Sequence, residues 1–249
     1  MRKSNQDFED FCSICKANSF YKRGNSFFRQ YGDGVLQVLQ YKKSSRPYEH
    51  VDIKIGLFSL YGELEAQWLT SSGCIPRYTA HWLEPGVKES FWDIRSKRIQ
   101  YMDDVRRVEC YSINLSFLQV TLFPFLDQIQ TQGQLADALM YLDTEASGPI
   151  KREIMWNDEL KIAPFLHSGN LESAYLVVSA ILNQHEIARQ WRQQNWNREE
   201  YEESSRKMHI ADANFYKVKN MIETANQDGI LTYLQKNYQR NIQLAPFLR

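Results

Sequence analysis

The chain has 249 residues, of which 43% are hydrophobic, 24% charged and 13% aromatic. This composition is typical of a globular protein and excludes global disorder, and the length suffices for one large domain or two small ones. Because 30 basic residues balance 30 acidic ones, the molecule has no net charge to attract nucleic acid or membranes, so any such attraction must be local.

The start of the chain and its apolar segments predict a location. The opening residues, MRKSNQDFEDFCSICK, lack the apolar stretch of a signal peptide. No uninterrupted apolar run approaches the roughly 20 residues that a membrane helix needs. We therefore expect a cytoplasmic protein that does not enter a membrane.

The first part of the chain alternates between apolar and polar residues. A short amphipathic helix is predicted over 7–18, followed by two strands, 26–31 and 35–42, around a glycine-containing hairpin turn. Neither face of the second strand is fully polar, so this strand is expected to be central. Strict alternation over 51–57 indicates a half-buried antiparallel strand, and 77–83 reads as another strand.

From residue 117 onward the apolar period becomes helical. Asn170 is predicted to N-cap a helix over 171–191, whose apolar face includes a histidine that we interpret as a satisfied core residue. A long charged helix over 197–226 is expected to end near Gly229 as its C-cap, and a last helix follows.

These elements predict an α+β fold. Residues 1–116 are expected to form an N-terminal antiparallel sheet with a leading helix, and residues 117–249 a C-terminal all-helical region. Because no Pro/Ser-rich linker separates the two parts, the helices are expected to pack against the sheet as one compact unit.

Two segments of the N-terminal part resemble a known family. They are NSFYKRGNSFFRQYGDGVLQVLQYKKS, which contains the turn Ser19–Gly24 and the strand end Tyr41–Ser44, and HVDIKIGLFSL. Together they resemble the bacterial proteins catalogued as domain of unknown function 4304. The resemblance covers about the first half of the chain and implies a bacterial cytoplasmic α+β domain. It implies no activity, since none is assigned to that family.

The cysteines and histidines do not predict a metal site. Cys12 and Cys15 form a CxxC motif, but Cys74 and Cys110 stand apart, and no two histidines have ligand spacing. Structural zinc sites usually combine two closely spaced ligand pairs. Cys12 and Cys15 instead share one helix face with Phe11. This position indicates that the two cysteines are buried as small hydrophobic residues. We therefore expect no metal and no cofactor.

The sequence also lacks common catalytic motifs. It has no glycine-rich phosphate loop between a strand and a helix, no G-x-S-x-G and no H-E-x-x-H. His81, beside Trp82 and Glu84, could serve acid–base chemistry, but no matching nucleophile accompanies it. No catalytic residue is assigned, and an enzyme of unrecognised type is the last of three functional hypotheses.

The segment 16–46 is rich in basic and aromatic residues and has one acid, Asp33. A basic sheet surface with stacking rings can bind single-stranded nucleic acid or another anionic ligand. Alternatively, the basic residues protect a sheet edge and the rings face the core. The candidate ligand-binding residues are Lys22, Arg23, Arg29, Lys42 and Lys43.

The long charged helix has a seven-residue apolar repeat, which we call the helix packing seam: Tyr201, Met208, Phe215 and Ile222. Small residues follow each of these at a distance of three, which favours close helix–helix packing. The other positions, Asp212 among them, are mostly charged and are expected to face solvent. Phe215 is expected to be buried, against another helix of the same chain or against a second copy.

The first functional hypothesis is therefore a non-catalytic binding or interaction protein, which has a protein partner or self-associates. The second is the nucleic-acid or anionic-ligand binder described above.

Overall fold

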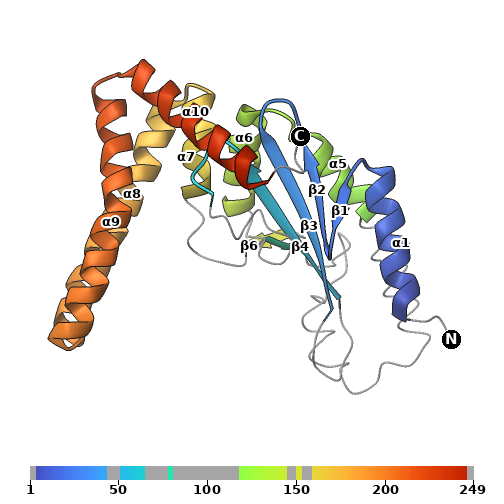
Figure 1. Cartoon of the computed structure of the whole chain (residues 1–249), viewed down its shortest axis with the longest axis horizontal. Coiled ribbons are helices and arrows are strands. Elements are labelled where there is room, and N and C mark those ends of the chain that lie inside the picture. The colour runs from blue at the N-terminus through green and yellow to red at the C-terminus, as the bar shows by residue number, and fades with distance from the viewer. Residues whose placement is uncertain are drawn as a thin grey trace.

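The structure is a computed structural model, which describes residues 4–43, 51–64, 78–80, 118–144, 150–152 and 159–245. It confirms the α+β class: a leading helix is followed by an antiparallel sheet and then by helices (Figure 1). No helix in these ranges combines the length and apolarity needed to cross a membrane.

The described strands form one antiparallel sheet whose spatial order follows the chain. The central position predicted for the second hairpin strand is confirmed, since that strand is hydrogen-bonded to a neighbour on each side. The strands are β1 (Tyr21–Arg23), β2 (Ser26–Gln30), β3 (Val35–Lys43), β4 (Val51–Ser59), β5 (Tyr78–Ala80) and β6 (Ile150–Arg152).

Strand β6 belongs to the part of the chain that was expected to be only helical. It pairs with β5, so the sheet includes a strand from beyond residue 116. A three-residue strand is too short to show a recognisable alternation, and only its pairing partner identifies it.

The β2–β3 hairpin turn depends on Gly34. This residue has a φ of +72°, which favours glycine, and a Cβ built on it would lie 2.7 Å from the Tyr61 ring. The turn is also anchored to the helical part, because the Asp33 carboxylate accepts a 2.7 Å hydrogen bond from the Gln132 backbone N–H. The hairpin tip is therefore fixed on two sides.

The helices cover the sheet and extend beyond it. A π-helical turn, η1 (Leu118–Leu122), precedes the second helix. The helices are α1 (Ser4–Ala17), α5 (Phe123–Asp127), α6 (Gln132–Thr144), α7 (Glu159–His167), α8 (Leu171–Asn195), α9 (Arg198–Glu223) and α10 (Gln227–Leu244).

The expected N-cap is confirmed and the expected C-cap is wrong. The Asn170 side chain accepts a 3.1 Å hydrogen bond from the Ser173 backbone N–H at the start of α8. Helix α9 ends at Glu223, where Ala225 adopts the positive φ of 50° that glycine was expected to supply. Gly229 lies in the first turn of α10 and donates its N–H to the Asn226 side chain.

Two apolar clusters form the core. The first lies between α1, the sheet and α5–α6 and joins Phe27 and Leu36 to Leu126 and Leu139, which come from the other half of the chain. The second joins α7, α8, α9 and α10. The helical part therefore packs against the sheet, as predicted.

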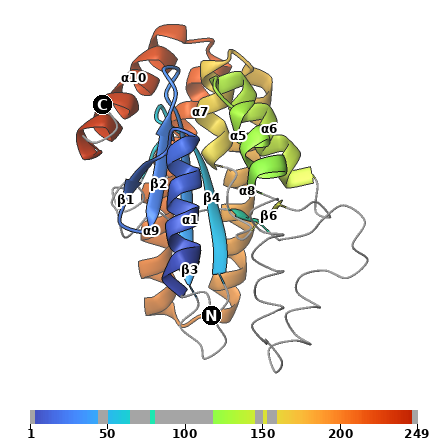
Figure 2. The same ribbon diagram turned by 90° about the vertical axis from the view of Figure 1, so that its right-hand side faces the viewer.

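Helices α8 and α9 form an antiparallel pair that extends away from the sheet, and we call this pair the arm (Figures 1 and 2). Helix α10 then returns toward the sheet. Its Asn241 side chain donates hydrogen bonds of 2.7 and 2.8 Å to the backbone oxygens of Leu60 and Gly62, just after β4. This anchor fixes the base of the arm to the sheet.

Candidate functional site

Arg29 was predicted to bind a ligand, but the structure commits its guanidinium to the fold. The residue is 8% exposed. Its Nε and Nη2 donate to Gln37 Oε1 at 2.9 and 2.7 Å, and its Nη1 donates to Asp127 Oδ1 at 2.6 Å. A buried cation requires such partners, because burial without them would cost several kcal/mol. Arg29 is therefore a structural residue, and its assignment as a ligand-binding residue is corrected.

The phenylalanine rings of the segment 16–46 lie in the core, as the alternative interpretation expected. Phe20, Phe27 and Phe28 are all buried. The Phe27 ring meets the Phe11 ring of α1 edge-on, with centroids 5.0 Å apart. Rings in this position cannot stack on the bases of a nucleic acid, so most of the aromatic platform that the second hypothesis required is committed to the core, while Tyr21 on β1 is 60% exposed.

The remaining cations of the hairpin lie on different strands. Lys22 and Arg23 are exposed on the short strand β1, and the Lys22 ammonium lies 4.5 Å from the centroid of the Phe8 ring. Lys42 and Lys43 are the last residues of β3, paired in register with β4. Their side chains lie outside the described part of the structure. Strand β2 separates the two groups in the sheet.

The CxxC cysteines face the sheet. Cys15 is completely buried and Cys12 partly buried, and both belong to the first core cluster. Burial, and to a smaller extent the neighbouring Cys12, raises the pKa of the Cys15 thiol. Such a thiol behaves as a small apolar side chain rather than as a nucleophile. Cys74, Cys110 and His81 lie outside the described residues.

The interior of the arm contains a charged cluster that sequence patterns did not predict. Asp212, expected to face solvent, is 1% exposed. Its Oδ1 lies 2.5 Å from His185 Nδ1, and its Oδ2 accepts a hydrogen bond from Arg189 Nη1. Arg189 also bonds Glu186 at 2.7 Å. His185 is therefore satisfied, as its position on the apolar face of α8 had indicated.

The Asp212 carboxyl group stays ionised although it is buried. Burial by itself raises the pKa of this carboxyl, but the hydrogen bonds from His185 and Arg189 outweigh it and hold the pKa below the usual range. The cluster thus consists of mutually compensating charges and links α8 to α9.

The helix packing seam is only partly buried. All four of its residues are of intermediate exposure, and Phe215 is partly buried against the second core cluster, so it is less buried than expected. The Phe215 ring packs 5.9 Å from the His185 ring, which places α8 against this side of α9. Among the α9 residues whose side chains the structure describes, the buried apolar ones are Val218 and Met221 instead. With α8 covering only one side of most of the helix, the buried strip is narrow.

The surface of α8 that faces away from the core is exposed and partly apolar. We call it the α8 outer face. Leu176, Ile187 and Trp191 are 62%, 58% and 56% exposed, on the side opposite the buried Val178 and Ile181. Its members, all exposed, are Leu176, Ala180, Asn183, Gln184, Ile187, Gln190 and Trp191.

The α8 outer face is also nearly uncharged. Between Ser173 and Asn195 the exposed charged residue is Glu186, and its carboxylate is paired with Arg189. In contrast, the exposed positions in the first half of α9 are dominated by Arg, Lys and Glu. Depletion of charge together with exposed aromatic and aliphatic side chains is typical of protein–protein interfaces.

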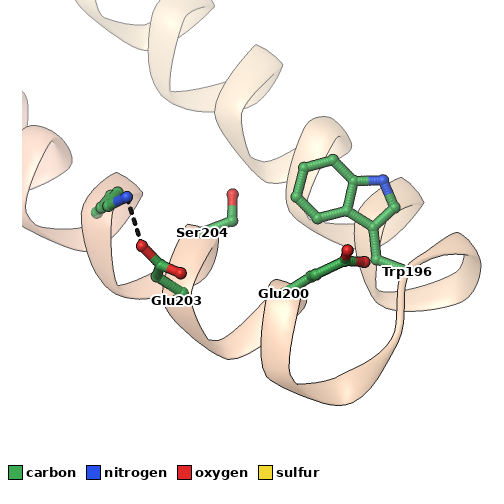
Figure 3. Close-up of a pocket in the computed structure, with 5 residues that line it drawn as sticks. Trp196, Glu200, Glu203 and Ser204 are labelled. Carbon is green, nitrogen blue, oxygen red and sulfur yellow. Dashed lines mark hydrogen bonds and ion pairs between the residues drawn. The ribbon is translucent and has the colours of Figure 1, made fainter.

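A shallow groove lies at the tip of the arm (Figure 3). It has a volume of about 490 Å³ and is lined by Trp196, Glu200, Glu203, Ser204 and Lys207. Two of its charged side chains pair with each other, since Lys207 Nζ lies 2.6 Å from Glu203 Oε1, a contact that also lowers the pKa of that carboxyl. The groove therefore combines an aromatic ring with one internal ion pair.

No protein-family model, curated protein or solved structure matches this chain. The resemblance to domain of unknown function 4304 therefore stays a hypothesis. The function must be inferred from the geometry of the candidate surfaces.

Proposed function

We propose that the protein is a non-catalytic interaction protein that binds a protein partner through the α8 outer face. The observation that supports this proposal is the exposure of Leu176, Ile187 and Trp191 on a nearly uncharged face of a projecting helix pair. Burying such side chains against a partner would be favourable, because transfer of apolar surface from water drives most protein association.

The two other hypotheses have less support. For the nucleic-acid or anionic-ligand hypothesis, Arg29 is committed to an internal ion pair, and the rings of Phe20, Phe27 and Phe28 are buried in the core. For an enzyme, the titratable cluster of His185, Arg189 and Asp212 is mutually satisfied inside the arm. That arrangement favours a structural role over acid–base chemistry.

Site-specific photo-crosslinking in the source cells tests the proposal. A benzoylphenylalanine side chain replaces Ile187 on the α8 outer face, and a matched control replaces Leu231, which is similarly exposed at 63% on α10. We expect a protein crosslink from position 187 and none from position 231, with the captured protein identified by mass spectrometry. Equal crosslinking at both positions, or none at position 187, would contradict the proposal.

A further inference from the structure

Apart from Gln190, the members of the α8 outer face have the same spacing when read in either direction. Ala180 lies four positions after Leu176, and Trp191 lies four positions after Ile187. Asn183 and Gln184 lie at the midpoint, three residues from the nearer apolar residue on each side. A surface with this symmetry meets itself in register when two copies of the helix run antiparallel.

We propose that the partner is a second copy of this chain, bound isologously with the two α8 helices antiparallel. This inference rests on the proposed function and specifies its partner. An isologous interface must be self-complementary. If residue i of one copy contacts residue j of the other, then residue j of the first copy contacts residue i of the second. The two-fold axis passes between Asn183 and Gln184.

The resulting pairs match in polarity. The large apolar side chains of Leu176 and the partner's Trp191 lie opposite each other at each end of the interface, and the small Ala180 lies opposite the partner's Ile187 nearer the axis. At the axis, Asn183 faces the partner's Gln184. These amides have both donors and acceptors, so they can bond each other across the axis.

Charge also favours this occupant. Like charges placed opposite each other across a symmetric interface repel, so a surface with few charged side chains accepts a second copy of itself most readily. The α8 outer face avoids such repulsion, because its exposed carboxylate, Glu186, is paired with Arg189.

The size of the contact favours weak association. From Leu176 to Trp191 the helix rises roughly 22 Å at 1.5 Å per residue. A single helix pair of this length belongs to the small end of specific interfaces, where transient complexes are found, so we expect a reversible dimer with a Kd in the micromolar range.

Sedimentation velocity of the full chain measures this association. The concentration should extend from about tenfold below to about tenfold above that range. We expect a shift from monomer to dimer. Ile187→Glu should weaken dimerisation by about tenfold or more, because it buries a carboxylate against the partner's Ala180. Leu231→Glu, the matched surface control, should leave the dimer unchanged.

A charge swap at the axis tests the antiparallel register itself. Gln184→Glu and Gln184→Lys should each dimerise less than the wild type, since each places like charges near the two-fold axis. Mixing the two variants should restore association as a heterodimer. A substitution that merely damages the fold would not be rescued by mixing.

Three outcomes would overturn the inference, and they separate it from the proposed function. A chain that stays monomeric, while position 187 crosslinks a different protein, refutes the second copy and leaves the proposed function standing. A chain that stays monomeric, with no crosslink at position 187, refutes both. A dimer that survives Ile187→Glu, or a charge swap without rescue, shows that the copies meet elsewhere.

Discussion

Arg29 and Gln37 show how single polar side chains join the two parts of the chain. Gln37 is fully buried on β3, and its amide donates hydrogen bonds of 2.7 and 2.8 Å to the backbone oxygens of Leu126 and Ile129. Leu126 lies in the last turn of α5, where helical carbonyls lack partners within the helix, and Ile129 lies two residues beyond the end of the helix. Arg29 orients that amide by bonding its oxygen.

Replacing Arg29 should therefore affect stability rather than binding. We expect Arg29→Met to lower the free energy of unfolding by about 1–3 kcal/mol, because the buried Gln37 oxygen loses its donors. Asp127 is half exposed and stays solvated, so Asp127→Asn should cost less. Urea denaturation of these variants provides the measurement, with Lys22→Met on the surface as the control. An unchanged Arg29→Met midpoint would contradict this role.

Asp212 should make the stability of the arm pH-dependent. Its folded-state pKa lies below the ordinary value, so its stabilisation is present above about pH 4 and is lost as the pH falls through the folded pKa. We expect Asp212→Asn to cost about 3–5 kcal/mol at neutral pH, since it leaves Arg189 without a buried anion. The difference from wild type should shrink in acid.

The control for Asp212 is Glu202→Gln, which removes an exposed ion pair with Arg198. Such surface pairs contribute about 0–1 kcal/mol, so this variant should follow the wild type at each pH. Urea denaturation at neutral and acidic pH compares the three proteins. A deficit in Asp212→Asn that is the same at both pH values would show that its charge is not the stabilising feature.

At the scale of elements, β4 combines an alternating pattern with one position where no side chain fits. Gly56 pairs with Val38 in the register of β3 and β4. The Phe58 ring folds back over it, so a Cβ built on Gly56 would lie 2.3 Å from Phe58 Cε2. Glycine weakens a strand interior unless a neighbouring group needs the space, and here the Phe58 ring fills it.

We accordingly expect Gly56→Ala to destabilise the protein by about 1–3 kcal/mol through overpacking. Phe58→Leu removes the ring, so the same alanine should cost much less in that background. Thermal unfolding of the two single variants and the double variant measures the coupling between the sites. If the stability losses of the two single variants simply add in the double variant, then the Phe58 ring is not the reason that position 56 requires glycine.

In the arm, the seven-residue repeat of α9 correctly indicated packing against another helix of the chain, but it did not identify the residues of α9 that are buried. The helix packing seam led to the interpretation that α9 packs on another helix of the chain, and α8 lies against it. Yet Arg192 of α8 donates to Ser204 Oγ at 2.7 Å and lies 2.8 Å from Met208 Sδ, so this part of the contact is partly polar. The distal half of the arm thus depends on charges as well as on apolar packing.

For the whole molecule, the balanced charge and the buried rings predict weak interaction with nucleic acid. We expect no salt-dependent binding of a short single-stranded oligonucleotide, measured by fluorescence anisotropy at low salt. The double variant Lys22→Glu, Arg23→Glu should behave like the wild type. Binding that weakens steeply with added salt would show phosphate contacts and restore the second hypothesis.

The sequence by itself determined the elements that local patterns specify. Alternation identified β3 and β4 and made β3 central, and Asn170 marked the start of α8, because neighbouring residues set strand faces and helix caps. Gly229 was misplaced although it lies near a real helix end. A glycine between two helical segments can cap the end of the first helix or lie in the first turn of the second. The sequence pattern is the same in both cases.

Only the tertiary structure decided which charges are buried and which apolar residues are not. Arg29 meets Asp127, and Arg189 meets Asp212, across separations that no local pattern spans. The exposure of Leu176, Ile187 and Trp191 likewise depends on which side of α8 the core occupies. The physical reason is that the cost of burying a charge, or of exposing an apolar group, depends on its partners in space, and these are brought together only when the chain folds.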